Sequence, residues 1–252
     1  MSSDFDKANI LITGAASGIG AATARLLAAR GAKKLILMDR DEDRMADFAF
    51  SLPCERQLLV GDVADEALWA RADLTGLTHA VVNAGIGDSG SIDESSFADW
   101  RRVMSVNLDG AFLTLQASMR AMKGGGGSIV LTASAAGLRA EPRIAAYGAS
   151  KAAVIHLARI AAKEGAAAGI RVNSIAPGGV ETPIWNGVPF FDEMVERHGS
   201  EEGAYKEIAS GATPMGRFAK PDEVAGQIAF LLSAEAGFVT GACLVSDGGY
   251  SL

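Results

Sequence analysis

The sequence predicts an α/β fold in which helices cover both faces of one parallel sheet. Short apolar runs alternate with longer segments of helical periodicity along the whole chain. The runs are almost continuously apolar, as expected for strands covered on both sides. No linker, repeat or charge block divides the 252 residues, of which 49% are apolar. We therefore expect a single domain over residues 1–252.

Seven apolar runs are predicted strands, because each is too short for a helix and ends at a turn or polar residue. The first run, for example, stops at Thr13-Gly14, and the sixth closes at Pro177-Gly178-Gly179. The predicted strands span residues 10–12, 35–38, 57–60, 79–82, 128–132, 170–175 and 243–245.

Segments with apolar residues every three or four positions are predicted helices. Gly31 suits the C-terminal cap of the first, and Pro221 suits the first turn of the last. Four glycines at 124–127 end the longest pattern. The predicted helices run from 19 to the cap at Gly31 and over 41–50, 65–71, 97–122, 147–168 and 221–232.

Polar or turn residues follow five of the predicted strands. They are Asp39, Asp62, Asn83, Ser134 and Pro177. In open parallel sheets, ligands bind beyond the carboxyl ends of the strands. One ligand is therefore expected to meet all five positions.

A glycine-rich turn links the first predicted strand to the first helix. Gly14, Gly18 and Gly20 are spaced G-x-x-x-G-x-G. Glycines at such a turn let the backbone approach a pyrophosphate, which binds at the positive N-terminus of the helix. A glycine-rich turn is often only a turn, but the position between strand and helix favours dinucleotide binding.

Asp39 lies 19 residues past Gly20, at the end of the second predicted strand. An acid there accepts hydrogen bonds from the adenosine ribose and repels a 2′-phosphate, so the sequence predicts NAD, with NADP as the less favoured cofactor. The adjacent Arg40 opposes this, because a guanidinium can bind that phosphate. The alternative for Asp39 is a turn residue or a helix N-cap.

Tyr147 and Lys151 are a phenol and an ammonium at i, i+4 spacing on a predicted helix, so they face the same space. A free tyrosine has a pKa near 10. A cation about 4 Å away favours the phenolate by about 4 kcal/mol at an effective dielectric of 20. We expect Lys151, helped by an oxidised nicotinamide, to bring the pKa of Tyr147 towards neutrality, so that the phenol serves as general acid and base.

Composition excludes several other classes of protein. The net charge of −7 argues against a nucleic-acid surface, and no apolar run approaches a membrane span. Two cysteines, Cys54 and Cys243, are too few for a disulfide framework, and with His79 and His198 they lack metal-ligand spacing, so no metal is expected. The chain opens without a secretory leader, which predicts a cytoplasmic protein.

Together these residues resemble the short-chain dehydrogenase/reductase family of about 250 residues. The likeness spans almost the whole chain. It rests on the glycine turn 13–20, Asp62-Val63, Asn83-Ala84-Gly85, Asn107, Ser134, Tyr147-x-x-x-Lys151, Pro177-Gly178, Thr182, Gly216-Arg217-Phe218, Pro221-Asp222-Glu223-Val224-Ala225 and Asp247-Gly248-Gly249. Two departures are Val82, where the family has Asn, and a short segment between Asp62 and Asn83, which predicts a stunted helix.

The resemblance implies a Rossmann fold with strand order 3-2-1-4-5-6-7 and a small substrate lid at about 183–215. It implies the catalytic residues Asn107, Ser134, Tyr147 and Lys151. It implies a cofactor site of Gly14, Ser17, Gly18, Ile19, Gly20, Asp39, Arg40, Asp62, Val63, Asn83, Ala84, Gly85, Tyr147, Lys151, Pro177, Gly178, Val180 and Thr182. Ser134 would hold the substrate oxygen, and Asn107 would hold a water connecting Lys151 to solvent. The alternatives are a strand-end turn serine and a locally satisfied helix asparagine.

The implied reaction is hydride transfer between nicotinamide C4 and a secondary alcohol or ketone. Residues 184–194 and Met215 include three aromatic side chains, which suit either an apolar lid over a bulky substrate or packing of the lid itself. The loop residues Asp88, Ser89, Ser91 and Asp93 are interpreted as a solvated loop or helix start. Other candidate functions are a 3-oxoacyl-carrier-protein reductase and an NAD-sensing regulator without turnover. The family also implies a homotetramer, formed through the helices at 97–122 and 147–168.

Overall fold

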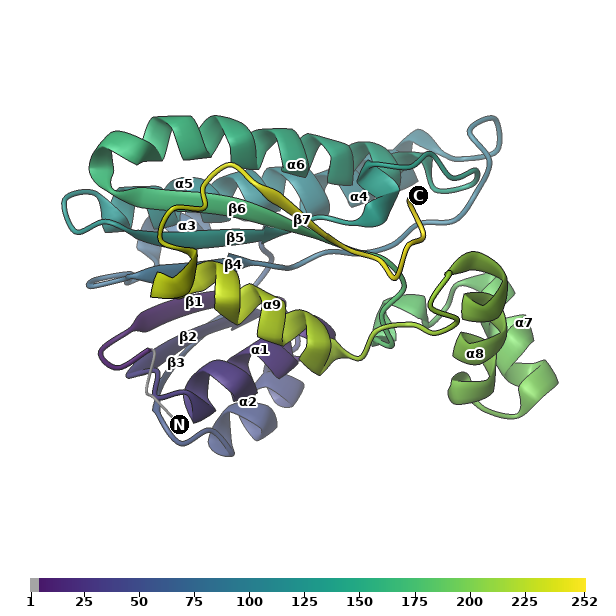
Figure 1. Ribbon diagram of the computed structural model, residues 1–252, viewed down its shortest axis with the longest axis horizontal. Coiled ribbons are helices and arrows are strands. Elements are labelled where there is room, and N and C mark those ends of the chain that lie inside the picture. The colour runs from purple at the N-terminus through teal and green to yellow at the C-terminus, as the bar shows by residue number, and fades with distance from the viewer. Residues whose placement is uncertain (1–4) are drawn as a thin grey trace.

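The computed structural model describes residues 5–252 and contains one seven-stranded parallel sheet (Figure 1). The strand order is β3-β2-β1-β4-β5-β6-β7, which confirms the predicted fold class and order. The strands are β1 (Asn9–Thr13), β2 (Lys34–Asp39), β3 (Glu55–Val60), β4 (His79–Val82), β5 (Gly127–Thr132), β6 (Ile170–Pro177) and β7 (Cys243–Ser246).

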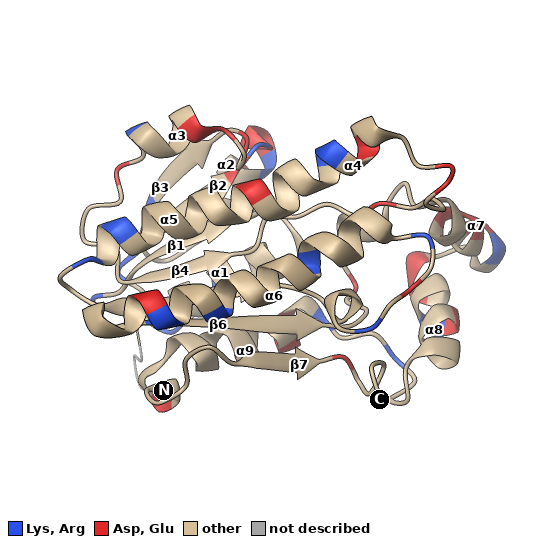
Figure 2. Cartoon of the chain, turned by 90° about the horizontal axis from the view of Figure 1, so that it is seen from above, with Lys and Arg blue, Asp and Glu red and all other residues tan. Residues whose placement is uncertain are grey.

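Helices cover the two faces of the sheet. One layer consists of α1 (Gly18–Ala29), α2 (Glu42–Phe50) and α9 (Pro221–Leu232). The other consists of α3 (Glu66–Arg71), α4 (Phe97–Met104), α5 (Gly110–Met122) and α6 (Ala145–Gly165), with α5 and α6 side by side over the sheet (Figure 2). No helix within residues 5–252 is long and apolar enough to cross a membrane.

The two cores follow from the alternation of side chains along the central strands. Ile10 and Ile12 of β1 pack into the core shared with α1 and α9, whereas Leu11 packs into the core under α5 and α6. All three side chains are fully buried. Because both faces of β1 are covered, both sets of alternating positions must be apolar, which explains the continuous apolar run in the sequence.

The edge strand β3 differs from this pattern. In β3, Glu55 and Arg56 are exposed, and Leu58 and Val60 remain partly exposed. β3 forms the sheet edge, and α3 has only six residues with which to cover it. The expectation of continuous burial therefore fails at the edge, where one face of the strand meets solvent.

The long helix predicted over 97–122 is not a continuous α-helix. A π-helical turn, Ser105–Asp109, separates α4 from α5. Such wider turns are rare and occur frequently at functional sites. The next predicted helix, 147–168, begins two residues early at Ala145 and ends in a 3-10 turn, Ala166–Ala168. Tyr147 consequently lies in the first turn of α6.

The segment predicted as a lid folds into helices beyond the carboxyl ends of the strands (Figure 1). A 3-10 turn, Pro183–Trp185, precedes α7 (Pro189–His198) and α8 (Glu201–Ala212). Their apolar side chains form a separate small core around Phe191, Tyr205 and Phe218. The segment is thus held together by its own packing.

Candidate active site

Lys151 is the most buried cation at the carboxyl end of the sheet, with 4% of its surface exposed. Its Nζ donates a hydrogen bond of 2.9 Å to the carbonyl oxygen of Thr132, the last residue of β5. The same Nζ lies 5.6 Å from the centre of the Tyr147 ring. The i, i+4 spacing therefore places the phenol and the ammonium in one space, as expected.

Ser134 lies two residues past the end of β5 and begins the 3-10 turn Ala135–Gly137. Its hydroxyl oxygen accepts a hydrogen bond from the Ala136 N–H at 3.2 Å, and its side chain faces the Tyr147 phenol. The backbone of α6 at Lys151 packs directly on Gly137. This contact holds the serine, the phenol and the ammonium in a fixed arrangement.

Burial acts on the protonation of both members of the pair. It raises the pKa of Tyr147, and the Ser134 hydroxyl only partly opposes this. Burial also lowers the pKa of Lys151, to about 8. Burial of the phenol therefore opposes the lowering of its pKa that is expected from Lys151 together with an oxidised nicotinamide.

Asn107 lies in the π-helical turn and is 1% exposed. Its Oδ1 accepts a hydrogen bond from Ile86 N–H (2.8 Å), and its Nδ2 donates to the Ile86 carbonyl (2.9 Å) and to Ser150 Oγ (3.2 Å). The side chain thereby joins the loop after β4 to α6. A Cβ atom at Gly85 would lie 3.2 Å from Lys151 Nζ and 3.3 Å from Asn107 Oδ1, so only glycine fits comfortably between them.

The glycine turn before α1 forms a tight backbone cradle. Gly14 and Gly18 adopt left-handed backbone angles, and a Cβ atom at Gly20 would overlap the carbonyl oxygen of Gly14. Ser17, the N-cap of α1, makes no side-chain capping bond to the described residues, and the first turn, which includes Ile19, holds no acid. The free N–H groups of this helix start suit a phosphate.

Asp39 borders this cradle at the end of β2. Its Oδ2 accepts a hydrogen bond from the Ala16 N–H (3.0 Å), and its Oδ1 accepts from the Asp41 N–H (3.1 Å). The N-cap of α2 is Asp41, which accepts from the Arg44 N–H. Asp39 therefore belongs to the glycine turn and not to the helix cap. Arg40 is exposed and forms no ion pair with any residue between 5 and 252.

The ends of β3 and β4 adjoin the same region. Asp62 accepts a hydrogen bond from the Ala64 N–H, and Val63 packs against Gly110 of α5. Thr13 Oγ1 accepts hydrogen bonds from the N–H groups of Asn83 and Ala84, at 2.9 and 3.1 Å. The Asn83 amide donates to the Thr13 carbonyl (3.0 Å), which joins the turn after β4 to the glycine turn.

The end of β6 completes the site. Gly178, after Pro177, lies against Asp247, and its N–H donates to the Ser246 carbonyl at 3.0 Å. Thr182 is buried, and its methyl group lies next to Gly18. The carbonyl of Thr182 accepts a hydrogen bond from Tyr205 of α8. Through Thr182 the helical segment meets the glycine turn.

The aromatic residues of 183–215 pack against one another to different extents. Trp185 stacks on Phe218 with ring centres 5.4 Å apart, and its Nε1 donates to the carbonyl of the buried Val180. Phe191 packs on Tyr205 in the same small core. These rings hold the segment together. Ile184, Phe190 and Met215 remain 39%, 44% and 65% exposed, and Ile184 lies near Gly87 in the loop after β4.

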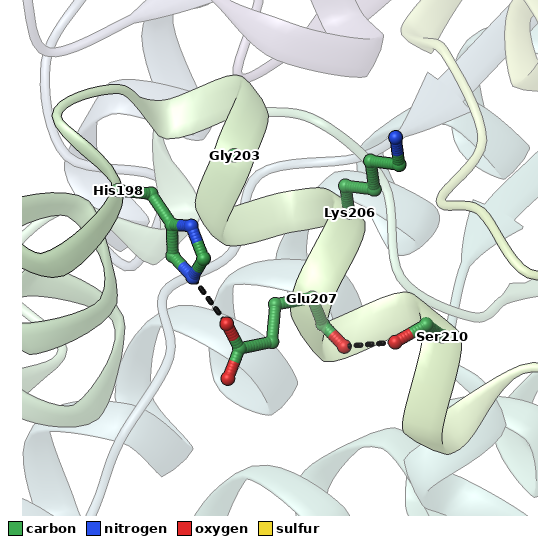
Figure 3. A pocket seen from close by; sticks show the side chains of 5 residues that line it. All are labelled: His198, Gly203, Lys206, Glu207 and Ser210. Carbon is green, nitrogen blue, oxygen red and sulfur yellow. Dashed lines mark hydrogen bonds and ion pairs between the residues drawn. The ribbon is translucent and has the colours of Figure 1, made fainter.

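A surface pocket between α7 and α8 is separate from this site (Figure 3). The side chains of His198 and Glu207 face one another there and share a hydrogen bond, and Lys206 lies at the edge of the pocket. Its lining contains none of the predicted site residues. The partner of His198, not apparent from the sequence, is thus a carboxylate nine positions along the chain.

Asp88 is the residue that sequence reasoning misread. It is half-buried, and its carboxylate accepts hydrogen bonds from the N–H groups of Ala146 and Tyr147. The interpretation as a solvated loop is wrong for this residue. No periodicity or motif signals the contact, because the partners lie 58 and 59 positions away.

The comparisons with known proteins agree with this geometry. A family model described as enoyl-(acyl carrier protein) reductase matches residues 14–251. Cis-4-hydroxycyclohexanecarboxylate dehydrogenase of Sinomonas cyclohexanicum is 37% identical, covering 100% of this chain and 99% of its own length. Cyclohexanol dehydrogenase of an Acinetobacter species is 38% identical, with 100% and 98% covered. The chain belongs to the short-chain dehydrogenase/reductase family.

A solved structure of the family extends the comparison to three dimensions. L-sorbose reductase from Gluconobacter frateurii, complexed with NADPH and L-sorbose, matches with a TM-score of 0.92 and 28% identity, covering 100% of this chain and 99% of that one. Members of this dehydrogenase family use nicotinamide cofactors. The glycine cradle, the free start of α1 and Asp39 fit such a dinucleotide by their own chemistry.

Gly20→Ala tests the cradle. The new methyl group would collide with the Gly14 carbonyl, and overpacking of this kind costs about 1–3 kcal/mol. We expect the Kd for NADH to rise by at least about tenfold, measured by fluorescence titration. Gly226→Ala is the matched control, because a Cβ atom there meets nothing within 4 Å. Equal NADH affinity in both variants would contradict the assignment.

Proposed function

We propose that this protein is an NAD-dependent dehydrogenase of hydrophobic secondary alcohols, which also reduces the corresponding ketones. The observation that carries the proposal is the contact of Tyr147 with Ser134 and Lys151 at the strand ends that also form the dinucleotide cradle. The bound nicotinamide would accept or supply the hydride. The protein supplies position and a proton.

In alcohol oxidation, Tyr147 takes the proton from the substrate hydroxyl as hydride leaves the carbinol carbon. Ser134 holds the substrate oxygen beside the phenol by a hydrogen bond. Lys151 stabilises the phenolate electrostatically, and Asn107 holds the loop around Gly85 against it. In ketone reduction the phenol returns the same proton, so atoms and charge balance in both directions. Retention of both Tyr147 and Lys151 counts against the regulator without turnover.

Tyr147→Phe removes the proton donor and leaves the ring. Positioned general acid–base groups contribute about 10²–10⁴ in rate, so kcat should fall by at least about 10². The Kd for NADH should stay within about threefold of wild type, because the cradle lies on other residues. Steady-state kinetics and fluorescence titration measure the two quantities. Near-wild-type turnover by this variant would refute the proposal.

The preference for NAD is supported by Asp39. Its carboxylate is held by the N–H groups of Ala16 and Asp41 at the edge of the glycine turn. A 2′-phosphate near it would face a fixed negative charge. The same preference counts against a 3-oxoacyl-carrier-protein reductase, which in this family mostly uses NADPH.

We expect kcat/KM for NADH to exceed that for NADPH by at least about tenfold, since about 1.4 kcal/mol of repulsion suffices. Asp39→Ser should reduce this ratio, while Arg40→Ala should leave it nearly unchanged. A wild-type preference for NADPH, lost in Arg40→Ala, would show that Arg40 selects the cofactor instead.

The substrate class is supported by apolar side chains near the site. Ile184, Phe190 and Met215 present exposed apolar surface, and Ile184 lies close to the loop after β4. The Sinomonas and Acinetobacter relatives are named as dehydrogenases of hydroxylated cyclohexane rings. A panel of cyclic, aromatic and acyclic secondary alcohols with NAD identifies the preferred class.

We further propose a homotetramer formed through α5 and α6. Phe112 on α5 and Ile160 on α6 are 47% and 44% exposed, which suits a covered apolar face. Sedimentation equilibrium should give about four times the 26.0 kDa of one chain. A monomer at micromolar concentration would contradict this. The cytoplasmic location stays a prediction.

A further inference from the structure

The loop between β4 and α4 is joined to the chain just before α6. The Gly90 N–H donates a hydrogen bond of 2.8 Å to the Arg143 carbonyl, and Gly90 pairs with Ile144 in a short parallel bridge. These backbone contacts bring Asp88, two residues before Gly90, to the first turn of α6. The position of Asp88 therefore follows from the fold and not from a flexible side chain alone.

Asp88 takes the place of a capping residue for α6. The N-cap position is Ile144, an apolar residue that has no side-chain acceptor. Asp88 Oδ2 accepts from the Ala146 N–H at 3.2 Å, and Oδ1 accepts from the Tyr147 N–H at 3.3 Å. A carboxylate at a helix N-terminus satisfies donors that the helix leaves unpaired and interacts favourably with the helix dipole. One of these donors is the backbone of Tyr147 itself.

We propose that Asp88 is a positioning residue that fixes the Tyr147 phenol against Ser134 and holds a negative charge beside it. This rests on the proposed function of Tyr147 as the acid and base. Ser134 faces the phenol from the turn after β5, and the Asp88 carboxylate accepts a hydrogen bond from the backbone N–H of the same residue from the loop after β4. Tyr147 is thus held from both sides.

The negative charge of Asp88 favours the neutral form of the Tyr147 phenol. The groups that face Asp88 are Arg102 on α4 and Tyr147 on α6, and those that face Tyr147 are Ser134, Lys151 and Asp88. Burial raises the pKa of Asp88, while hydrogen bonds from the N–H groups of Tyr147 and Ala146 and the charge of Arg102 oppose this rise. The carboxylate raises the pKa of Tyr147, because it disfavours a second negative charge nearby.

The raised pKa of Tyr147 determines how Asp88 affects the reaction. A phenol with a raised pKa stays protonated over a wider pH range, which favours proton donation to a ketone. Once the proton is lost, the phenolate is a stronger base. Oxidation of an alcohol needs that phenolate. With Asp88 present, the oxidation rate therefore begins to rise at a higher pH.

Two substitutions separate position from charge. Asp88→Asn removes the charge and keeps one of the two oxygen acceptors, which can still bind the Tyr147 N–H, so the rising limb of kcat for oxidation should shift to lower pH by roughly half a unit, with kcat at its plateau within about threefold of wild type. Asp88→Ala also removes the acceptor, and kcat should fall about tenfold with the KM for NAD unchanged. Asp93→Asn, in the exposed part of the same loop, is the matched control and should behave as wild type.

A second readout does not depend on turnover. The chain contains three tyrosines, so the tyrosinate absorbance of wild type minus that of Tyr147→Phe reports the ionisation of Tyr147. The midpoint of this difference should move to lower pH in Asp88→Asn. An unchanged midpoint would overturn the proposal, whether or not Asp88→Ala folds. Absence of turnover over the alcohol panel, with a shifted midpoint, would instead contradict the proposed function and leave Asp88 as a positioning residue for Tyr147.

Discussion

The site depends on a buried ammonium. Lys151 lies almost wholly out of solvent, and a charge in such a place must find hydrogen-bond acceptors or lose its proton. Thr132 supplies one acceptor at the end of β5, and Gly85, which also borders Asn107, lies against the same nitrogen. Burial lowers the pKa of Lys151 to about 8, so its charge near neutral pH is sensitive to its surroundings. The π-helical turn, the loop after β4 and the start of α6 all contribute to enclosing this one group.

The parallel sheet explains why residues so distant in sequence meet there. The carboxyl ends of β1, β2, β4, β5 and β6 share one edge, and hydrogen bonds between their turns hold that edge together. Thr13 Oγ1 accepts hydrogen bonds from the N–H groups of Asn83 and Ala84 in the turn after β4. The Asp39 carboxylate accepts a hydrogen bond from the Ala16 N–H in the glycine turn. The glycine cradle and the residues proposed to transfer the proton are therefore parts of a single hydrogen-bonded edge. The helices of 183–215, packed by their own aromatic core, border it through Thr182.

The family resemblance predicted the strand order. Local patterns in the sequence predicted the glycine turn and the shared space of Tyr147 and Lys151. Each of these depends on spacing within one element or on a motif that spans one turn. Four features depend on contacts over long sequence distances and escaped prediction. Asp88 reaches α6 across 58 positions, and Asn107 lies in a π-helical turn inside an ordinary helical pattern. Burial opposes the expected lowering of the Tyr147 pKa, and the packing of Trp185 on Phe218 needs the fold of the whole 183–215 segment. Composition cannot separate a ring that packs a lid from one that contacts substrate.

The central claim is that this edge of the sheet transfers a hydride between a carbinol carbon and nicotinamide C4. Cyclohexanol deuterated at its carbinol carbon, incubated with the protein and NAD, tests this most directly, with proton NMR of the recovered NADH as the readout. We expect deuterium at one face of C4, and labelling that is at least about a hundredfold slower in a parallel incubation with Tyr147→Phe. If cyclohexanol and the rest of a panel of deuterated secondary alcohols leave NAD unlabelled, although NADH binds tightly, the claim is wrong.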